Sequence, residues 1–428
     1  MRPDESPAPP IRLISAESVV VGMAGLLVLG PWLFVSSPQY REAGLLGFGL
    51  MAACVGWFIP DLRRAACDPF VRWVVTCLFV AQAASMTGGL RHGAPLANVL
   101  AHGFSGTIGA LGLGVLTWVL LEPSWRPWVR RTILAVTILL ATGSLVGHFV
   151  FTQWQEDLSK LSPYMDPRRL ALVWPTRLVA GDLGRQYWAH ANTAAFLFAT
   201  AWVLVVEALF PKPRFAWIGW LLALILGAAV FLTASRSAWL MVLLTLPLLL
   251  VWRGWRFSIQ VGVLLATAVF LGIAGLNWKG GAAGSRITAP AEVPEEIHLG
   301  GLIDRGSAGR SSGYHYLWDQ LEGDRLFGHG LAVTRTPMIH LLHEHSTYLA
   351  TLRGGGITAL VAQLVLMGGA VMAALRLART GCRWPLILTV VVFSGLLFDR
   401  STVFRLTGFE EFPAFWFTVW IPLAMRIR

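Results

Sequence analysis

A dense group of titratable side chains stands immediately before a long apolar run. The stretch HLLHEHSTYLATLRGGGITALV covers residues 340–361 and places three histidines and a glutamate within six residues. His345 is followed by Ser346, a residue type that often forms the N-cap of a helix, so its imidazole is expected at a helix start. Histidine has an ordinary pKa of about 6.5, which suits a general base near neutral pH. His345 is therefore the candidate base.

The same cluster does not match the common zinc templates. HExxH beginning at His343 would need a histidine at 347, where Thr347 stands, and HxxEH ending at His345 would need one at 341, where Leu341 stands. Adjacent histidines could still ligate an ion, and His340 and His343 also fit the role of solvated loop residues. We expect no metal.

Arginines at the borders of apolar runs form a second candidate group. Arg236 lies in the short turn TASRSAW (233–239), Arg305 and Arg310 in DRGSAGRSSG (304–313), and Arg185 in GRQYWAHANTAAF (184–196). A single border arginine is often an anchor whose charge reaches the membrane surface. Several on one side indicate an anionic ligand, because a guanidinium binds phosphate through two parallel hydrogen bonds.

The composition shows what kind of chain must position these residues. It has 428 residues, of which 55% are hydrophobic and 13% charged, and its mean hydropathy is +0.62. Soluble domains carry about 25% charged residues. We therefore expect an all-α polytopic membrane protein, with residues 1–428 forming one integral membrane domain.

About twelve apolar runs are long enough to cross a bilayer, which takes roughly 17–25 residues. They are predicted at 14–35, 43–60, 70–88, 95–121, 130–150, 188–210, 215–233, 237–252, 257–276, 346–375, 384–398 and 410–425. Helices fit better than barrel strands, because the runs lack an alternation of period two. No cleavage site follows the first run, so it is expected to be retained.

Basic residues in the short loops predict the orientation. Loops such as LRR (62–64), PKPR (211–214) and WRGWR (252–256) fall on one side, so both termini are expected in the cytoplasm. Two long loops, at 151–187 and 277–345, then lie outside. The second is predicted to contain an amphipathic helix at 311–327, because Tyr314, Leu317, Trp318 and Leu321 share a helical face. It would lie on the bilayer or cover a lipid substrate.

Several functions lack support in the sequence. The net charge of +11 fits topology and anionic lipid, and no soluble basic domain exists to bind nucleic acid. The four cysteines lie outside the long outer loops and have no CxxC spacing. Neither a Walker motif nor an acidic pair of the DxD type in an outer loop is present, so no cofactor is expected. The glycines at 354–356 would let a backbone or a lipid approach closely.

Together these motifs resemble the O-antigen ligase family, which shares a superfamily with O-antigen polymerases and pilin oligosaccharyltransferases. HSTYLATLRGGGITAL (345–360) resembles the family pattern in which His, Asn or Ser, any residue, Tyr and Leu open a glycine-containing helix. SRSAW with Arg236, Arg310 followed by Trp318 and FGHG (327–330), and Arg185 with Asn192 resemble its other elements. The sequence departs from the pattern at Ala359, where the family has a second glycine.

The resemblance implies a reaction and its partners. A glycan carried on undecaprenyl diphosphate would be transferred to a sugar hydroxyl of lipid A–core on the periplasmic face of the bacterial inner membrane. His345 would be the base, oriented by Glu344. Arg236 and Arg310, helped by Arg185 or Arg305, would stabilise the leaving diphosphate. A polymerase or a protein oligosaccharyltransferase remains an alternative. So does a secondary transporter, which would place ionisable residues near the middle of the bilayer.

Overall fold

The computed structural model describes part of the chain. The described residues are 67–101, 103–104, 106–107, 110, 134–135, 137–139, 141–146, 172–173, 188–189, 191–208, 216–233, 235–276, 321, 324–330, 346–381 and 383–397. The predicted spans at 14–35, 43–60 and 410–425 lie outside these residues, as does most of both long loops.

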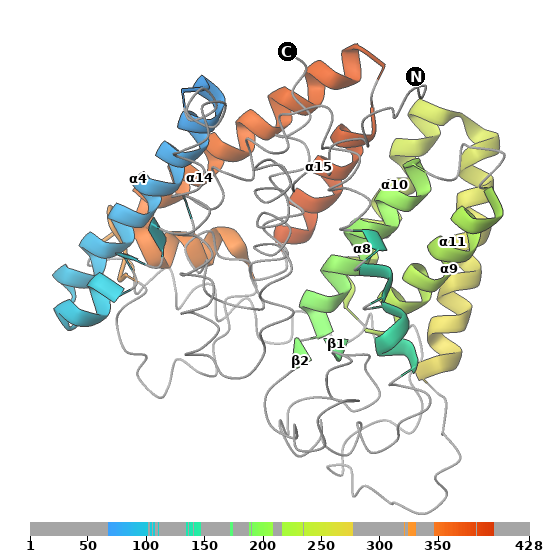
Figure 1. Cartoon of the computed structure of the whole chain (residues 1–428), viewed down its shortest axis with the longest axis horizontal. Coiled ribbons are helices and arrows are strands. Elements are labelled where there is room, and N and C mark those ends of the chain that lie inside the picture. The colour runs from blue at the N-terminus through green and yellow to red at the C-terminus, as the bar shows by residue number, and fades with distance from the viewer. Residues whose placement is uncertain are drawn as a thin grey trace, which may run out of the picture.

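Seven long helices dominate the described part (Figure 1). They are α4 (Pro69–Arg91), α8 (Ala191–Ala208), α9 (Ala216–Leu232), α10 (Arg236–Arg253), α11 (Trp255–Leu276), α14 (Thr347–Arg379) and α15 (Trp384–Leu396). A short antiparallel pair, β1 (Leu172–Val173) and β2 (Trp188–Ala189), precedes α8. The span predicted to begin at 188 therefore begins as a helix only at Ala191. The described residues of 96–110 and 134–146 are also helical.

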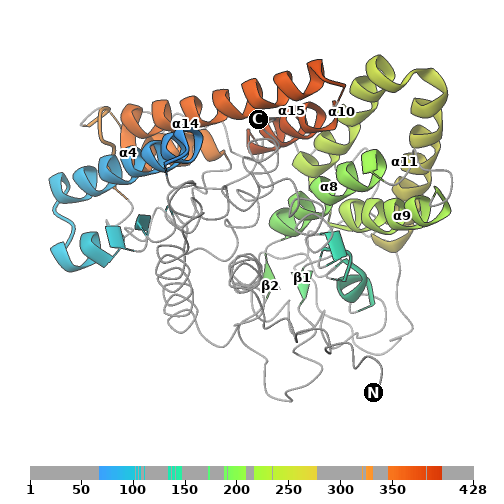
Figure 2. The same ribbon diagram turned by 45° about the horizontal axis from the view of Figure 1, so that its top comes forward.

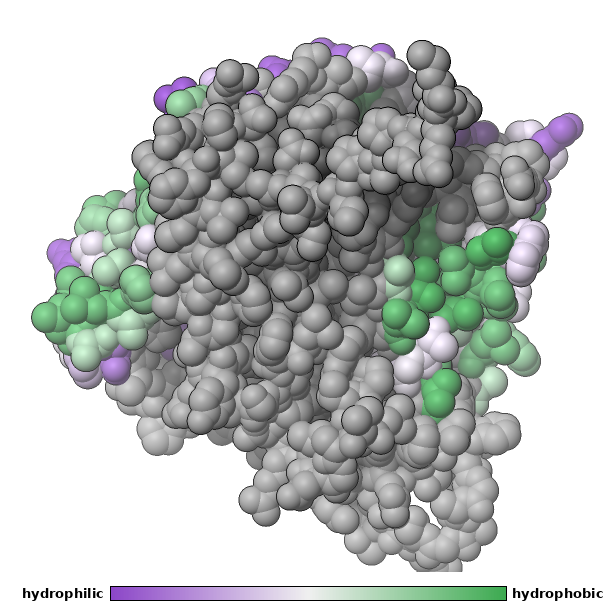
Figure 3. Space-filling view, in the orientation of Figure 1, coloured by the Kyte–Doolittle hydropathy of each residue, from purple (hydrophilic) through white to green (hydrophobic). Residues whose placement is uncertain are grey.

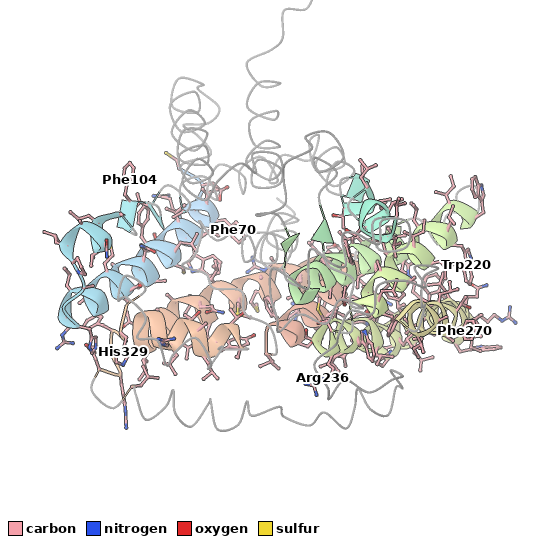
Figure 4. The ribbon with its side chains drawn as sticks, turned by 90° about the horizontal axis from the view of Figure 1, so that it is seen from below. Phe70, Phe104, Trp220, Arg236, Phe270 and His329 are labelled. Carbon is pink, nitrogen blue, oxygen red and sulfur yellow. The ribbon has the colours of Figure 1, made fainter. Side chains whose placement is uncertain are left out.

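Four helices are long and apolar enough to cross a membrane. They are Pro69–Arg91, Arg236–Arg253, Trp255–Ala274 and Thr347–Arg379. Exposed apolar side chains cover the sides of the molecule: in Figure 3 hydrophobic residues gather at the left and right of the view, and Phe104 and Phe270 lie at opposite edges in Figure 4. Such surface is expected where lipid replaces water as the solvent. The described residues thus confirm a multi-pass helical membrane protein; the number twelve stays a prediction.

The helices form two groups joined by α15 (Figures 1 and 2). One group is the pair α4 and α14, and the other contains α8, α9, α10 and α11. Helix α15 contacts α14 on one side and α8 and α10 on the other. The second group holds most of the described core, including the fully buried side chains of Phe198, Trp202 and Leu226.

Small residues bring α4 and α14 into close antiparallel contact. Ala81 and Ala84 of α4 form a buried cluster with Ala359 and Ala362 of α14. Gly369, further along α14, packs against the ring of Trp73 near the start of α4. Small side chains are the usual means by which membrane helices approach closely, because apolar burial gives little driving force in lipid. The alanine at 359 is thus a packing residue of this interface.

One end of the molecule collects the candidate chemistry. The Arg383 guanidinium at the start of α15 donates to the Trp252 carbonyl at the end of α10 at 3.2 Å. Because α14 ends at Arg379, only four residues before Arg383, helices α10 and α14 end on the same side of the molecule. We call the side at which α4 ends and α10 and α14 begin the loop face. Arg91, Arg236 and Ser346 all stand at this face.

Candidate functional site

A segment of the second long loop is docked between α4 and α14 at the loop face. Asp324–Gly330, here called the docked loop, is built of turns and bends, not helix. The helix predicted for 311–327 is therefore wrong at its end. Residues 325–327 form a turn, which is closed by the Gly328 amide donating to the Asp324 backbone carbonyl at 3.0 Å. Of the rest of that helix only Leu321 is described, in a 3₁₀ turn.

The docked loop occupies a break in α14. Gly356 has φ 65° and ψ −164°, which interrupts the helix after its first nine residues, Thr347–Gly355. The amides of Ile357 and Thr358 instead donate to the carbonyls of Arg325 and Leu326, at 2.8 and 3.2 Å. In return the Arg353 carbonyl accepts the His329 amide at 2.8 Å. The docked loop thus supplies hydrogen-bond acceptors for the amides that the broken helix leaves without a partner. Buried backbone N–H groups need such acceptors.

Glycines allow this contact between backbones. A Cβ added to Gly356 would meet the backbone of Leu326, and one added to Gly88 of α4 would meet the carbonyls of Phe327 and Gly328. Gly328 and Gly330 have φ of 63° and 77°, a conformation that side chains rarely adopt. The sequence-based expectation that Gly354–Gly356 admits a neighbouring backbone holds at Gly356, and that backbone is the docked loop.

An ion pair fastens the docked loop to the end of α4. The Arg91 guanidinium donates to Asp324 Oδ2 at 2.9 Å, and the Phe327 amide donates to Asp324 Oδ1 at 3.1 Å. The Asp324 side chain is 8% exposed, whereas that of Arg91 is 56% exposed and also lies over the Phe327 ring. The Asp324 carboxylate is therefore buried and bonded within the protein, whereas more than half of the Arg91 side chain is exposed.

Two imidazoles complete the cluster. His92, the C-cap residue of α4, stacks on His329 of the docked loop with ring centroids 4.2 Å apart. Partial burial lowers the pKa of His92, and the neighbouring His329 and Arg91 lower it further, against an opposing effect of Asp324. The surroundings therefore disfavour the charged form of the His92 imidazole.

We expect Asp324→Asn to loosen the docked loop moderately. The asparagine side chain keeps an oxygen that accepts from the Phe327 N–H but lacks the negative charge that pairs with Arg91. Because Arg91 is largely exposed, this loss should cost only about 0.5–1 kcal/mol, while Asp324→Ala should cost about 1–2 kcal/mol more by leaving the Phe327 amide without its partner. Hydrogen exchange of peptides containing His329 and Ile357–Thr358 measures both. Equal exchange in wild type and Asp324→Ala would show that the Asp324 carboxylate does not hold the docked loop in place.

Arg236 is the one sequence-predicted site residue that falls within the described part. It is the first residue of α10 and is partly buried. The turn that holds it is internally bonded: the hydroxyls of Ser235 and Ser237 lie 3.0 Å apart, and the Trp239 amide donates to the Ser235 carbonyl. The Trp239 indole N–H is buried and has no hydrogen-bond partner among the described residues. In Figure 4 His329 lies beside α4 and α14, whereas Arg236, the first residue of α10, lies apart from it and nearer the middle of the view.

The remaining predicted residues, His345, Glu344, Arg185, Arg305 and Arg310, lie outside the described residues. The start of α14 is described. Ser346 is the N-cap residue, as expected, but its hydroxyl makes no capping hydrogen bond. Two residues later, the Tyr348 hydroxyl donates to the Phe393 carbonyl of α15 at 3.4 Å, and the ring packs against the core of the α8–α11 group. The first part of α14 thus leads from the docked loop toward the group that contains Arg236.

Sequence reasoning missed the cluster at the end of α4. Neither Arg91 nor His92 was among the candidate residues. A signal was present, because LRHG (90–93) and FGHG (327–330) each place a histidine before a glycine. Within the described residues, no group of three His, Cys, Asp or Glu side chains could hold a metal ion.

No protein-family model matches the sequence, and no curated protein matches it. The geometry and the sequence motifs therefore carry the functional conclusion.

Proposed function

We propose that the protein is an O-antigen ligase of the bacterial inner membrane, acting on the periplasmic face. It would transfer a glycan from undecaprenyl diphosphate to a sugar hydroxyl of lipid A–core. The main support is the path of α14. The histidine motif stands immediately before this helix, and the break at Gly356 leads the helix start toward the group whose loop face carries Arg236. Base and cation would then both stand at the loop face.

The placement of charge favours this enzyme over a transporter. In the seven described long helices, arginines stand near the ends, as at Arg72, Arg91, Arg236 and Arg253. Arg353, further inside α14, is three residues before the break. A transporter would place ionisable residues near the bilayer midplane instead.

The reaction assigns one task to each group. The His345 imidazole takes the proton of the acceptor hydroxyl as its oxygen attacks the anomeric carbon. The bond from that carbon to the diphosphate oxygen breaks, and its electron pair leaves with undecaprenyl diphosphate. Attack opposite the leaving group inverts the anomeric centre. Arg236 and Arg310, with Arg185 or Arg305, would balance the charge that develops on the diphosphate, and Glu344 would orient the imidazole.

A transfer assay tests the proposal. The purified chain would be incubated with undecaprenyl diphosphate-linked glycan and lipid A–core, with chelator and without nucleotide. A ladder of lipopolysaccharide is expected on lipid A–core. Longer glycan on the carrier, with no ladder, would identify a polymerase instead. No change in either lipid would contradict both activities and favour transport.

We expect Arg236→Lys to reduce transfer strongly, by about 10²-fold, which is the loss typical of removing one donor that stabilises a leaving anion. A lysine ammonium keeps the charge but cannot form two parallel hydrogen bonds to a phosphate. Arg253→Lys is the matched control, because it makes the same change at the other end of α10. Wild-type rates for Arg236→Lys would reduce Arg236 to a membrane anchor.

A further inference from the structure

Side chains with N–H donors from two separate elements meet at the end of α4. Arg91 and His92 belong to α4, and His329 belongs to the docked loop. The nearby carboxylate of Asp324 is 8% exposed, and its two oxygens accept from Arg91 and from the Phe327 amide. An approaching anion would therefore meet the exposed part of the Arg91 guanidinium and the two imidazole rings, whereas the carboxylate is mostly covered.

This cluster stands at the border of an apolar surface. Three leucines close to these residues in the sequence are largely exposed: Leu90 by 50%, Leu96 by 60% and Leu326 by 55%. Helix α4 is long enough to cross a membrane and ends at Arg91. A cation at the end of a spanning helix, beside exposed leucines, lies at the level of lipid headgroups.

We propose that Arg91, His92 and His329 bind the phosphate of a membrane lipid, and that the bound phosphate holds the docked loop on α4. Arg91 carries five N–H donors, of which one is directed at Asp324, and more than half of its side chain is exposed while it is so paired. The stacked imidazoles add further ring N–H groups beside it. The acyl chains of the lipid would lie against the leucines.

Such a site couples lipid binding to docking. Because His329 joins Arg91 and His92 only when the loop is docked, a phosphate that contacts all three binds the docked state alone. Its binding then stabilises that state by mass action. Opening of the docked loop should become about 100-fold rarer at a free lipid concentration of about 100 times the dissociation constant.

Hydrogen exchange of the detergent-purified full chain tests the coupling. The peptides to follow contain His329 and Ile357–Thr358, whose amides are bonded only when the loop is docked. Four additives would be compared: phosphatidylglycerol, bisphosphorylated lipid A, diacylglycerol and inorganic phosphate. Exchange should slow with phosphatidylglycerol and should not change with diacylglycerol. Slowing by lipid A alone would indicate binding of the acceptor of the proposed transfer and would overturn the proposal of a general membrane-lipid site.

Two further outcomes would overturn the proposal. Equal slowing by inorganic phosphate would show a free-anion site, and no slowing by either phospholipid would show no site. In the double variant His92→Ala/His329→Ala the response to lipid should fall at least about tenfold, which is the effect of about 1.4 kcal/mol in binding. Arg256→Gln, at the opposite end of the bundle, should respond as wild type. If the double variant does not fold, the four additives still decide with the wild-type chain. No glycan transfer is measured, so the result is independent of the ligase proposal.

Discussion

Replacing His345 with alanine is expected to reduce glycan transfer by about 10²–10⁴-fold, the range over which a positioned general base accelerates a reaction. The acceptor hydroxyl would lose the group that takes its proton, while the diphosphate would still meet its arginines. Binding of the donor should therefore change little, and the loss should appear in kcat rather than in KM. Steady-state transfer to lipid A–core, measured over a range of donor concentrations, separates the two.

The neighbouring histidines are the matched controls for this variant. His340→Ala and His343→Ala change the same residue type within the same short segment, and both should transfer at close to the wild-type rate. Normal transfer by His345→Ala would exclude it as the base. Equal losses in all three variants would indicate a shared structural role for the segment.

Gly356→Ala should have the largest effect on the fold. Its φ of 65° and ψ of −164° lie in a region that is almost restricted to glycine, and its Cβ would meet the backbone of Leu326. Strain of this kind costs about 1–3 kcal/mol. Relief by straightening the helix would displace the docked loop. We therefore expect exchange protection at His329 to be lost, together with most transfer activity.

Gly368→Ala is the control for that substitution. Gly368 lies in the same helix, and a Cβ added there meets nothing within 4 Å. Alanine is also the better helix former, by about 1 kcal/mol. Gly368→Ala should therefore be as stable as the wild type or more so. If Gly356→Ala kept full protection at His329, the docked loop would not depend on the break.

Apolar composition predicted the spanning helices of the described part, because a bilayer requires apolar side chains along the whole length of a span. Hydrophobic runs at 70–88 and 257–276 correspond to α4 and α11 within a few residues. The break in α14 was beyond such reasoning. Three consecutive glycines permit a close approach, but the partner, Leu326, belongs to another segment, and nothing local in the sequence names it.

The same limit applies to the candidate site. Arg236 was predicted from its position between two apolar runs, and it does begin a helix at the loop face. The cluster of Arg91, His92 and His329 depends on a contact between residues 233 positions apart in the chain, as the Arg91–Asp324 pair shows. Pairings at such separation follow from tertiary packing, which a single sequence does not reveal.

The break at Gly356 also imposes an order on biosynthesis. Helix α4 and the docked loop are both made before Ile357 and Thr358, whose amides the loop must receive. Until those residues have left the ribosome, the carbonyls of Arg325 and Leu326 have no such partners. Docking is therefore not complete until residue 358 has been made, and a nascent chain that stops short of residue 357 would hold the histidine motif without the contacts that fix the start of α14.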